Sequence, residues 1–413
     1  MNKTENEIGS LVSGAVFGTN GIREESRRRI RELASAQGIY PASIQNLYEV
    51  AGRGQYNNMT VPAINIRGVT YHVARAVFLA AMKNAVGPFI FEIARSEIGY
   101  TGQRPAEYTA CILAAAVKED FRGPVFIQGD HFQVNSGKYN LDPEKELNTI
   151  KELIQEAVDA GFYNIDIDAS TIVDLDKQSL EEQQELNCQV TAFMTRFIRS
   201  IQPEGTTISI GGEIGEVGGK NSTVEDLRAF MSGYLPLLRP DIKGISKISV
   251  QTGTTHGGVV LPDGSIASVK IDFDTLRELS RVAREEYGMG GAVQHGASTL
   301  PDEAFDKFPE TGTIEVHLAT GFQNIIYDSP YFPQELLKDI NRHLLEKYAD
   351  ERKQGETDEQ LLYKTRKKAF GDFKEEMWSL PEDNLKRLRD ALEERFSFIF
   401  RKLNVDNTAE LVV

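Results

Sequence analysis

The feature of this sequence that most restricts its fold is a regular alternation of short apolar runs with longer helix-like stretches. Eight apolar runs of strand length occur between Val61 and Leu318, separated by stretches with helical periodicity. The expected strands are Val61–Ile66, Pro88–Ala94, Val125–Gln128, Tyr163–Asp168, Thr207–Glu213, Ile245–Gln251, Ala292–His295 and Thr313–Leu318. Eight such units in series predict an α/β chain folded as a (β/α)8 TIM barrel.

A doubly wound open sheet would show the same alternation of strands and helices. The two topologies differ in where their functional residues lie, because an open sheet concentrates them at one switch point. Here polar and glycine-rich residues follow nearly every expected strand at its carboxyl end. We therefore expect a barrel, over residues 61–329, with the functional residues on its carboxyl-terminal rim.

The two flanks of the barrel differ from it in composition. Residues 1–60 are polar and predict an N-terminal extension, and residues 330–413 are highly charged and predict a helical C-terminal extension. Apolar residues recur at helical spacing near the C-terminus, at Leu385, Leu388, Leu392, Phe396, Ile399 and Leu403. This stripe predicts a helix packed on the barrel or at a subunit interface, and we expect a homo-oligomer. The basic cluster Arg366–Lys368 is expected to be a solvated surface without a function.

Composition excludes several classes of partner. The net charge of −15 argues against nucleic acid, because phosphate backbones are bound by basic faces. No stretch of the sequence is apolar enough to be expected in a membrane. The two cysteines, Cys111 and Cys188, form no spacing motif, which fits a reducing cytoplasm.

Four of the six histidines lie where an expected strand ends, namely His131, His256, His295 and His317. A catalytic zinc site needs three protein ligands that converge from different elements and leave a fourth position open. Histidines at the ends of several barrel strands provide this convergence. The pattern predicts a metalloenzyme.

The sharpest local motif is Gly129-Asp130-His131 at the end of the third expected strand. Adjacent residues there can direct one side chain to a metal and the other to the substrate, so Asp130 is the candidate for proton transfer. Two His-Gly pairs, at His256 and His295, strengthen this interpretation. Their glycines, Gly257 and Gly296, would let the backbone approach a small ligand closely.

Acidic residues near other strand ends are further candidates. Glu213 could bind the metal or orient a histidine, whereas Glu216 is expected in an exposed loop. Asp166 and Asp168 share one face of their strand, and Asp168 lies closer to the site. Lys247 is the one candidate for a Schiff base, but it lies too deep in its strand to reach a substrate.

The series GDH, YNIDIDAS, GGEIGEVGG, TGTTHGG, QHGAS and ATGFQN resembles the class II, metal-dependent ketose-bisphosphate aldolases in order and approximate spacing. The resemblance implies that His131, His256 and His295 bind zinc, that Asp130 transfers protons, and that Glu213 is associated with the metal. Another divalent ion could replace zinc, and a monovalent cation is compatible with the family. The expected reaction is cleavage of fructose 1,6-bisphosphate to dihydroxyacetone phosphate and glyceraldehyde 3-phosphate.

The resemblance is weaker where the family binds its substrate. The usual Asn-x-Asp-Thr of the last strand is replaced by His317-Leu318-Ala319-Thr320, and Gly296-Ala297-Ser298 keeps only part of a phosphate motif. No basic cluster is expected to assist phosphate binding. The residues expected to contact the sugar or its phosphate are Asn65, Asp168, Gly219, Gly257, Gly296, Ser298, His317 and Thr320.

A second resemblance leaves the reaction open. The stretch FEIARSEIGYTGQRPAEY followed by QGDHFQVN is similar to the non-catalytic type of tagatose-bisphosphate aldolase subunit and to related 4-epimerases. The alternatives to an aldolase are therefore a zinc-dependent 4-epimerase and an accessory subunit. Because all three metal histidines are present, we expect a catalytic chain.

Overall fold

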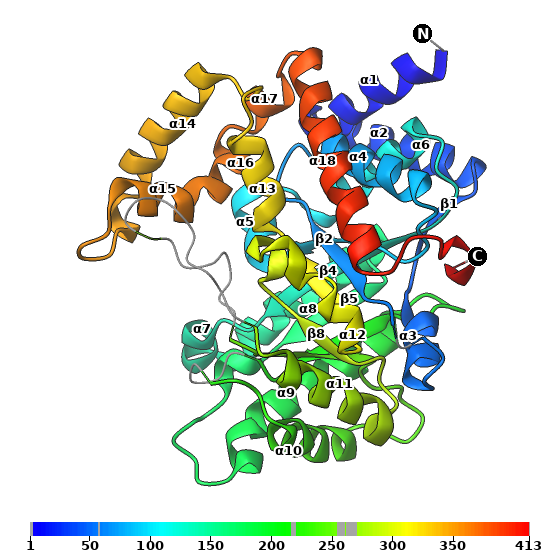
Figure 1. Cartoon of the computed structure of the whole chain (residues 1–413), viewed down its shortest axis with the longest axis vertical. Helices are drawn as coiled ribbons and strands as arrows, with labels where there is room; N and C mark the ends of the chain where they lie inside the picture. The colour runs from blue at the N-terminus through cyan, green and yellow to red at the C-terminus, as the bar shows by residue number, and fades with distance from the viewer. Residues whose placement is uncertain (1–2, 57, 216–219, 254–260, 262–270, 413) are drawn as a thin grey trace.

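The computed structural model describes residues 3–56, 58–215, 220–253, 261 and 271–412. Its centre is a closed barrel of eight parallel strands, in which β4 pairs with β5 and β9 returns to pair with β2 (Figure 1). The strands are β2 (Val61–Asn65), β3 (Ile90–Ala94), β4 (Gly123–Gln133), β5 (Asn164–Asp168), β6 (Ser209–Glu213), β7 (Lys247–Val250), β8 (Ala292–Gln294) and β9 (Glu315–Leu318). The predicted (β/α)8 barrel is confirmed, and each expected strand is present with shifted ends.

Helices surround the barrel and connect its strands. The longer ones are α4 (Thr70–Lys83), α6 (Pro105–Lys118), α8 (Pro143–Ala160), α9 (Leu180–Ile201), α10 (Val224–Tyr234), α11 (Phe273–Tyr287) and α13 (Thr320–Tyr327). Shorter helices are α5 (Arg95–Thr101), α7 (Ser136–Leu141) and α12 (Lys307–Glu310). Local sequence signals determine where several helices begin. Ser179 and Glu182 form a capping box at the start of α9, and proline occupies the first turn of α6 and of α8. In the described residues, no helix has the length and apolar character needed to cross a membrane.

The N-terminal extension contains a strand that the sequence did not predict. β1 (Ile39–Ala42) pairs in parallel with the first residues of β4, ahead of the residues of β4 that pair with β5. Pro41 is tolerated because β1 lies at an edge. The helices α1 (Lys3–Phe17) and α2 (Asn20–Ala36) pack on α6, and α3 (Gln45–Gly52) packs near α11.

The C-terminal extension consists of helices along one side of the barrel: α14 (Gln334–Lys347), α15 (Asp358–Thr365), the 3-10 turn η6 (Arg366–Lys368), α16 (Ala369–Asp372), α17 (Lys374–Trp378) and α18 (Glu382–Lys402). Figure 1 shows α18 beside α4. The predicted apolar stripe of α18 is buried within the chain, and Phe396 packs against Phe322 of α13. Because the chain itself covers the stripe, α18 does not present it to a second subunit.

Candidate active site

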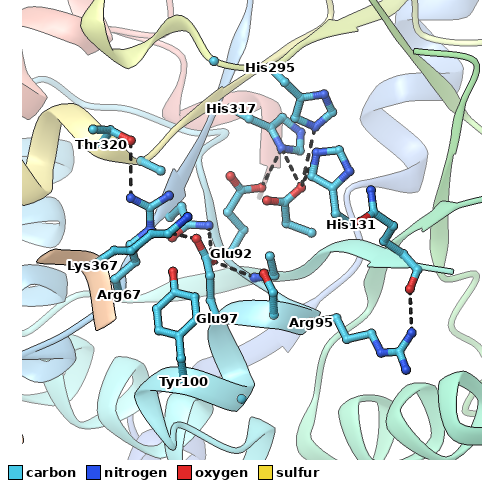
Figure 2. A pocket seen from close by; sticks show the side chains of 18 of the residues that line it. Arg67, Glu92, Arg95, Glu97, Tyr100, His131, His295, His317, Thr320 and Lys367 are labelled. Carbon is cyan, nitrogen blue, oxygen red and sulfur yellow. Dashed lines mark hydrogen bonds and ion pairs between the residues drawn. The ribbon is translucent and has the colours of Figure 1, made fainter. Parts of the chain in front are cut away.

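The carboxyl-terminal rim of the barrel contains a pocket of about 480 Å³. Figure 2 shows histidines on one side of it and the cationic side chains of Arg67 and Lys367 on another. Its walls come from β2, β3, β4 and β9, from the segment that follows β8, and from α5, α7, α13 and the C-terminal extension. The strand ends that the sequence singled out therefore meet at one cavity.

An irregularity in β4 aims His131 into this pocket. The pairing of β4 with β5 shifts register between Gly129 and Phe132, and His131 has a φ of 41°, in the left-handed region. A bulge of this kind redirects a side chain from its regular position on the strand. The ring of Phe132 folds over Gly129, where a Cβ atom would overlap it. Glycine at position 129 therefore leaves room for the Phe132 ring, and the bulge that follows turns His131 toward the pocket.

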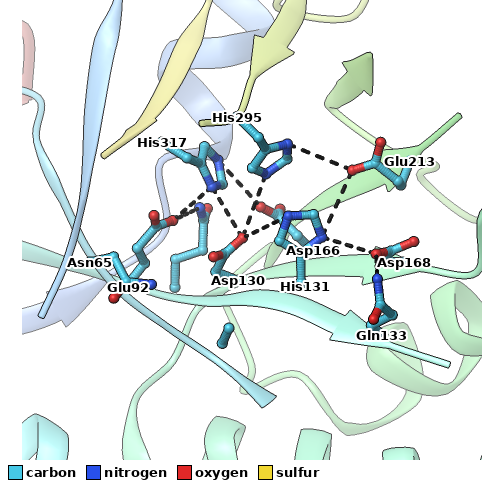
Figure 3. A network of polar contacts seen from close by, with 12 residues as sticks. Asn65, Glu92, Asp130, His131, Gln133, Asp166, Asp168, Glu213, His295 and His317 are labelled. Atoms are coloured by element: carbon cyan, nitrogen blue, oxygen red, sulfur yellow. Dashed lines mark hydrogen bonds and ion pairs between the residues drawn. The ribbon is translucent and has the colours of Figure 1, made fainter. Parts of the chain in front are cut away.

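Three histidine rings gather around the carboxylate of Asp130 (Figure 3). The ring centroids of His131 and His295 are 4.1 Å apart, as are those of His295 and His317. Asp130 Oδ1 is 3.1 Å from His317 Nδ1, 3.6 Å from His295 Nε2 and 3.7 Å from His131 Nε2. All four side chains are largely excluded from solvent.

Two carboxylates lie behind these histidines. Glu213 Oε2 is 3.9 Å from His131 Nδ1 and 3.7 Å from His295 Nδ1. Asp168 Oδ2 is 3.0 Å from His131 Nδ1, on the side of the ring away from Asp130, and it does not line the pocket. Asp168 is thus placed to orient His131, and it lies behind the pocket wall, where the sequence had predicted a residue that contacts the sugar.

These side chains suit a divalent metal. His131, Glu213 and His295 have donor atoms within 4.8 Å of one another, and Asp130, His295 and His317 form a second such group. Imidazole nitrogen and carboxylate oxygen are the donors that zinc takes in catalytic sites. The donor set therefore fits the ion expected from the sequence.

The charges in this cluster also favour a cation. Burial alone would raise the pKa of Asp130, but the imidazoles of His131 and His317 outweigh it and hold the pKa well below its usual range. Burial opposes protonation of His131, yet Asp130 and Asp168 raise its pKa to about 10. Burial, followed by the neighbouring His131 and His317, keeps the pKa of His295 well below its usual range. The carboxylates thus require positive charge, which a metal would supply in place of protons.

His317 differs from the two histidines near Glu213. Its Nδ1 is 3.0 Å from Glu92 and its Nε2 is 2.6 Å from Glu315, so both ring nitrogens already face carboxylates. The sequence left two roles open for His317, substrate contact and a satisfied buried histidine; the residue lines the pocket, and its ring nitrogens are already paired. His317 holds Asp130 in place.

A buried polar network forms the floor of the site. Lys247 Nζ contacts the carboxylates of Asp166 and Glu315, and the Tyr48 hydroxyl also donates to Glu315. The Lys247 side chain is 1% exposed. A lysine held in this way is not available to a substrate carbonyl, which agrees with the sequence-based argument against a Schiff base.

Residues expected to bind phosphate lie on the pocket wall. Gly296, Ser298 and Thr320 line it, as does Asn65, whose amide donates to Glu97 at 2.6 Å. Ser298 Oγ accepts the backbone N–H of Gly321 at 3.1 Å. The expected site residues Gly219, His256 and Gly257, together with Glu216, lie outside the described residues.

The expectation that Arg366–Lys368 is a solvated surface is wrong for Lys367, which lines the pocket. Arg67, Arg95 and Lys138 line it too, so the absence of a basic cluster is also corrected. Sequence reasoning missed Glu92 and Glu315 as well. Both glutamates lie inside apolar strand runs, and a charged residue buried there needs a partner of opposite charge or a hydrogen bond. That position could have identified them as part of the site.

The comparisons with known proteins agree with this geometry. A family model described as "Fructose-bisphosphate aldolase class-II" matches residues 45–379. Curated relatives include the D-tagatose-1,6-bisphosphate aldolase subunit GatZ of Escherichia coli K12, 28% identical over 160 residues. That alignment covers 37% of this chain and only 35% of the relative.

Solved structures with the same fold are distant in sequence. A fructuronate-tagaturonate epimerase of Cohnella laeviribosi aligns over 93% of this chain and 86% of its own, with a TM-score of 0.63 and 13% identity. A fructose-bisphosphate aldolase of Campylobacter jejuni aligns over 90% and 97%, with a TM-score of 0.54 and 18% identity. At these identities the structures support the fold and do not distinguish between the two activities.

Proposed function

Because this chain belongs to the class II fructose-bisphosphate aldolase family, we propose that it is a metal-dependent aldolase acting on a ketose phosphate. The proposed substrate is fructose 1,6-bisphosphate, and the products are dihydroxyacetone phosphate and glyceraldehyde 3-phosphate. One observation carries the proposal: Asp130 lies between three imidazoles at the end of a pocket with cationic walls.

The proposed metal ligands are His131, His295 and Glu213, with His256 as a further ligand on the strength of the family resemblance. A divalent ion at these residues would stabilise the negative charge that develops on the substrate carbonyl oxygen. His295 suits this role because burial keeps it neutral.

Asp130 is the proposed base. Its carboxylate would accept the proton of the C4 hydroxyl while the bond between C3 and C4 breaks and its electrons remain on C3. His317, 3.1 Å from Asp130 Oδ1, fixes the orientation of the carboxylate and keeps it ionised. Glu92 and Glu315 hold His317 from behind.

A 4-epimerase is the second candidate. The specific observation in its favour is that His317 and Ala319 stand where aldolases of the family have the Asn and the Asp of Asn-x-Asp-Thr. The same bond cleavage, followed by re-addition to the other face of the aldehyde, would invert C4 without release of fragments. The assembled cluster of Asp130, His131 and His295 argues against an accessory subunit without chemistry of its own.

The deciding experiment uses the purified, zinc-loaded chain with fructose 1,6-bisphosphate and tagatose 1,6-bisphosphate in separate reactions. Aldolase activity releases triose phosphates, whereas an epimerase converts one ketose into the other. Asp130→Asn should retain zinc and lose turnover by about two to four orders of magnitude. Asp274→Asn, at an exposed carboxylate, is the control. Turnover by Asp130→Asn near that of the wild type would contradict the proposed base.

We also propose that the chain acts in the cytoplasm as a homo-oligomer. Both cysteines are buried and free, which is compatible with a reducing compartment. Since the stripe of α18 is covered within the chain, another surface must supply the interface. Light scattering on the intact protein tests the assembly, and a monomeric mass would exclude it.

A further inference from the structure

One wall of the pocket comes from the C-terminal extension. Lys367 belongs to the turn η6 and lies about 300 residues after Arg67 in the chain, yet both residues line the same cavity. Figure 2 shows the two cationic side chains next to Glu97 and Tyr100, on the side of the pocket where Thr320 lies.

The contacts of its neighbours fix the position of Lys367. The backbone carbonyl of Arg366 accepts the Tyr327 hydroxyl at 2.9 Å, and the Arg366 guanidinium lies 4.4 Å from the ring centroid of Tyr363. Phe370, three residues after Lys367, lies so close to Gly68 that a Cβ atom at Gly68 would overlap the Phe370 ring. The turn that carries Lys367 is therefore attached on both sides and is not a loose surface segment.

Lys368 provides an internal comparison. It pairs with Glu351 and lies 4.4 Å from the ring centroid of Tyr348, away from the pocket. Lys367, by contrast, has no carboxylate within ion-pair distance in the described part of the chain, and its Nζ is 6.0 Å from the centroid of the Tyr100 ring. Burial lowers the pKa of Lys367, and the nearby Arg67 lowers it further. A bound anion would relieve both effects.

Arg67 adds a second positive charge to the pocket wall that Lys367 lines. It pairs with Glu97 through Nε at 2.7 Å and donates from Nη1 to Thr320 Oγ1 at 3.3 Å and to Gln323 Oε1 at 3.0 Å. These bonds hold the guanidinium rigidly at the pocket wall. With Glu97 neutralising one of the two cations, Arg67 and Lys367 together leave one positive charge. In a chain of net charge −15, local charge of this kind is needed to attract an anionic substrate.

We propose that Arg67, Lys367 and Thr320 form the subsite for a terminal oxyanion of the substrate, so that the C-terminal extension completes the active site. The ligand is the phosphate ester or the carboxylate at one end of an open-chain sugar. This assignment rests on the proposed function, because the oxyanion belongs to the same molecule that reaches Asp130. The Lys367 ammonium would donate to the oxyanion directly, which is a charge-assisted hydrogen bond.

The test measures binding and does not depend on turnover. Isothermal titration of the full-length, zinc-loaded protein with glycerol 3-phosphate compares the wild type with Lys367→Met, Lys367→Arg and Lys368→Met. We expect Lys367→Met to bind about tenfold or more weakly, which corresponds to at least ~1.4 kcal/mol. Lys367→Arg, which keeps a charged donor for the oxyanion, and Lys368→Met should bind within about threefold of the wild type. Equal binding by Lys367→Met and the wild type, or an equal loss in Lys368→Met, would overturn the subsite.

A parallel titration with gluconate distinguishes the two oxyanions. Loss on Lys367→Met for glycerol 3-phosphate alone assigns a phosphate, and loss for gluconate alone assigns a carboxylate. Failure of the wild type to bind either ligand overturns the subsite. If binding depends on Lys367 but no ketose phosphate is converted, the proposed function fails and the subsite stands. If ketose phosphates are cleaved and Lys367→Met retains wild-type binding and KM, the subsite alone fails.

Discussion

The carboxylate of Asp168 lies 3.0 Å from Nδ1 of His131, so this nitrogen carries a proton and donates it to Asp168. Asp168 is itself held by Gln133, which donates to it at 2.6 Å, and by Ser170. Burial would raise the pKa of Asp168, but its bond to His131 outweighs burial and lowers the pKa to about 2. Nδ1–H of His131 therefore donates to an ionised carboxylate, and Nε2 is the nitrogen on which a metal would replace the second proton of the ring.

Asp168→Asn should weaken zinc binding by about ten- to a hundredfold, the usual effect of losing a carboxylate that orients a metal-binding histidine. The amide can no longer accept from the ring with a full charge, so His131 loses its fixed orientation. Competition with a chelator measures the zinc affinity. Asp274→Asn serves as the exposed control, and an unchanged affinity in Asp168→Asn would show that Asp168 does not support the metal site.

The three predicted metal histidines can be tested one at a time. His131→Ala, His256→Ala and His295→Ala should each purify folded and nearly free of zinc, because loss of one of the three histidine ligands removes most of the affinity. His343→Ala, in which the replaced side chain pairs with Asp372 in the C-terminal extension, is the matched control. Elemental analysis provides the readout, and full zinc occupancy in any of the three variants would remove that residue from the ligand set.

Lys247→Met should destabilise the fold. The substitution removes the lysine that Asp166 and Glu315 share and leaves His317 as the cation beside them, and removal of one partner from a buried charge network costs about 3–5 kcal/mol. Denaturant unfolding at pH 7 measures the change. A loss below about 1 kcal/mol would mean that Tyr48 and Gln128 compensate for the missing lysine.

His72 gives a pH-dependent contribution to stability that is independent of the active site. Burial, followed by the nearby Arg389, lowers its pKa from 6.5 to about 3. The folded chain thus keeps His72 neutral, whereas the unfolded chain protonates it below pH 6.5. The resulting stability is fully present above pH 6.5 and declines as the pH falls toward 3, by up to about 1.4 kcal/mol per pH unit.

The variant His72→Gln isolates this effect from the titration of carboxylates. Its side chain can still accept from Arg389 of α18, but it does not titrate. Between pH 6.5 and 5 its free energy of unfolding should decrease less steeply than that of the wild type. Parallel pH profiles for the two proteins would show that His72 remains protonatable in the folded chain.

The barrel could be predicted from sequence because its strands are buried on both faces and therefore read as apolar runs. β1 could not, since Ile39–Ala42 is four residues long and contains a proline. The histidine cluster was predictable for a related reason: strand ends in a barrel meet at one rim, so sequence position already implies proximity.

The cationic side of the pocket was not predictable in this way. Lys367 reaches it from a turn between short helices, and no periodicity in the sequence indicates which face of such a turn meets the barrel. Lys368, the next residue, points elsewhere. The contact of Arg366 with Tyr327 and the packing of Phe370 on Gly68 orient this turn, and in both pairs the residues are far apart in the chain.

The contact of Phe370 with Gly68 couples the thermal unfolding of the C-terminal extension to that of the barrel. Gly68 connects β2 to α4, α4 in turn packs against α18, and Phe370 precedes α18 in the chain. The C-terminal extension therefore contacts one βα unit of the barrel at two places, Phe370 on Gly68 and α18 on α4, and Lys367 lies three residues before the first of these contacts. Heating should therefore unfold the extension together with this βα unit, and a chain shortened at residue 330 would lose the cover of α4 and one pocket wall together.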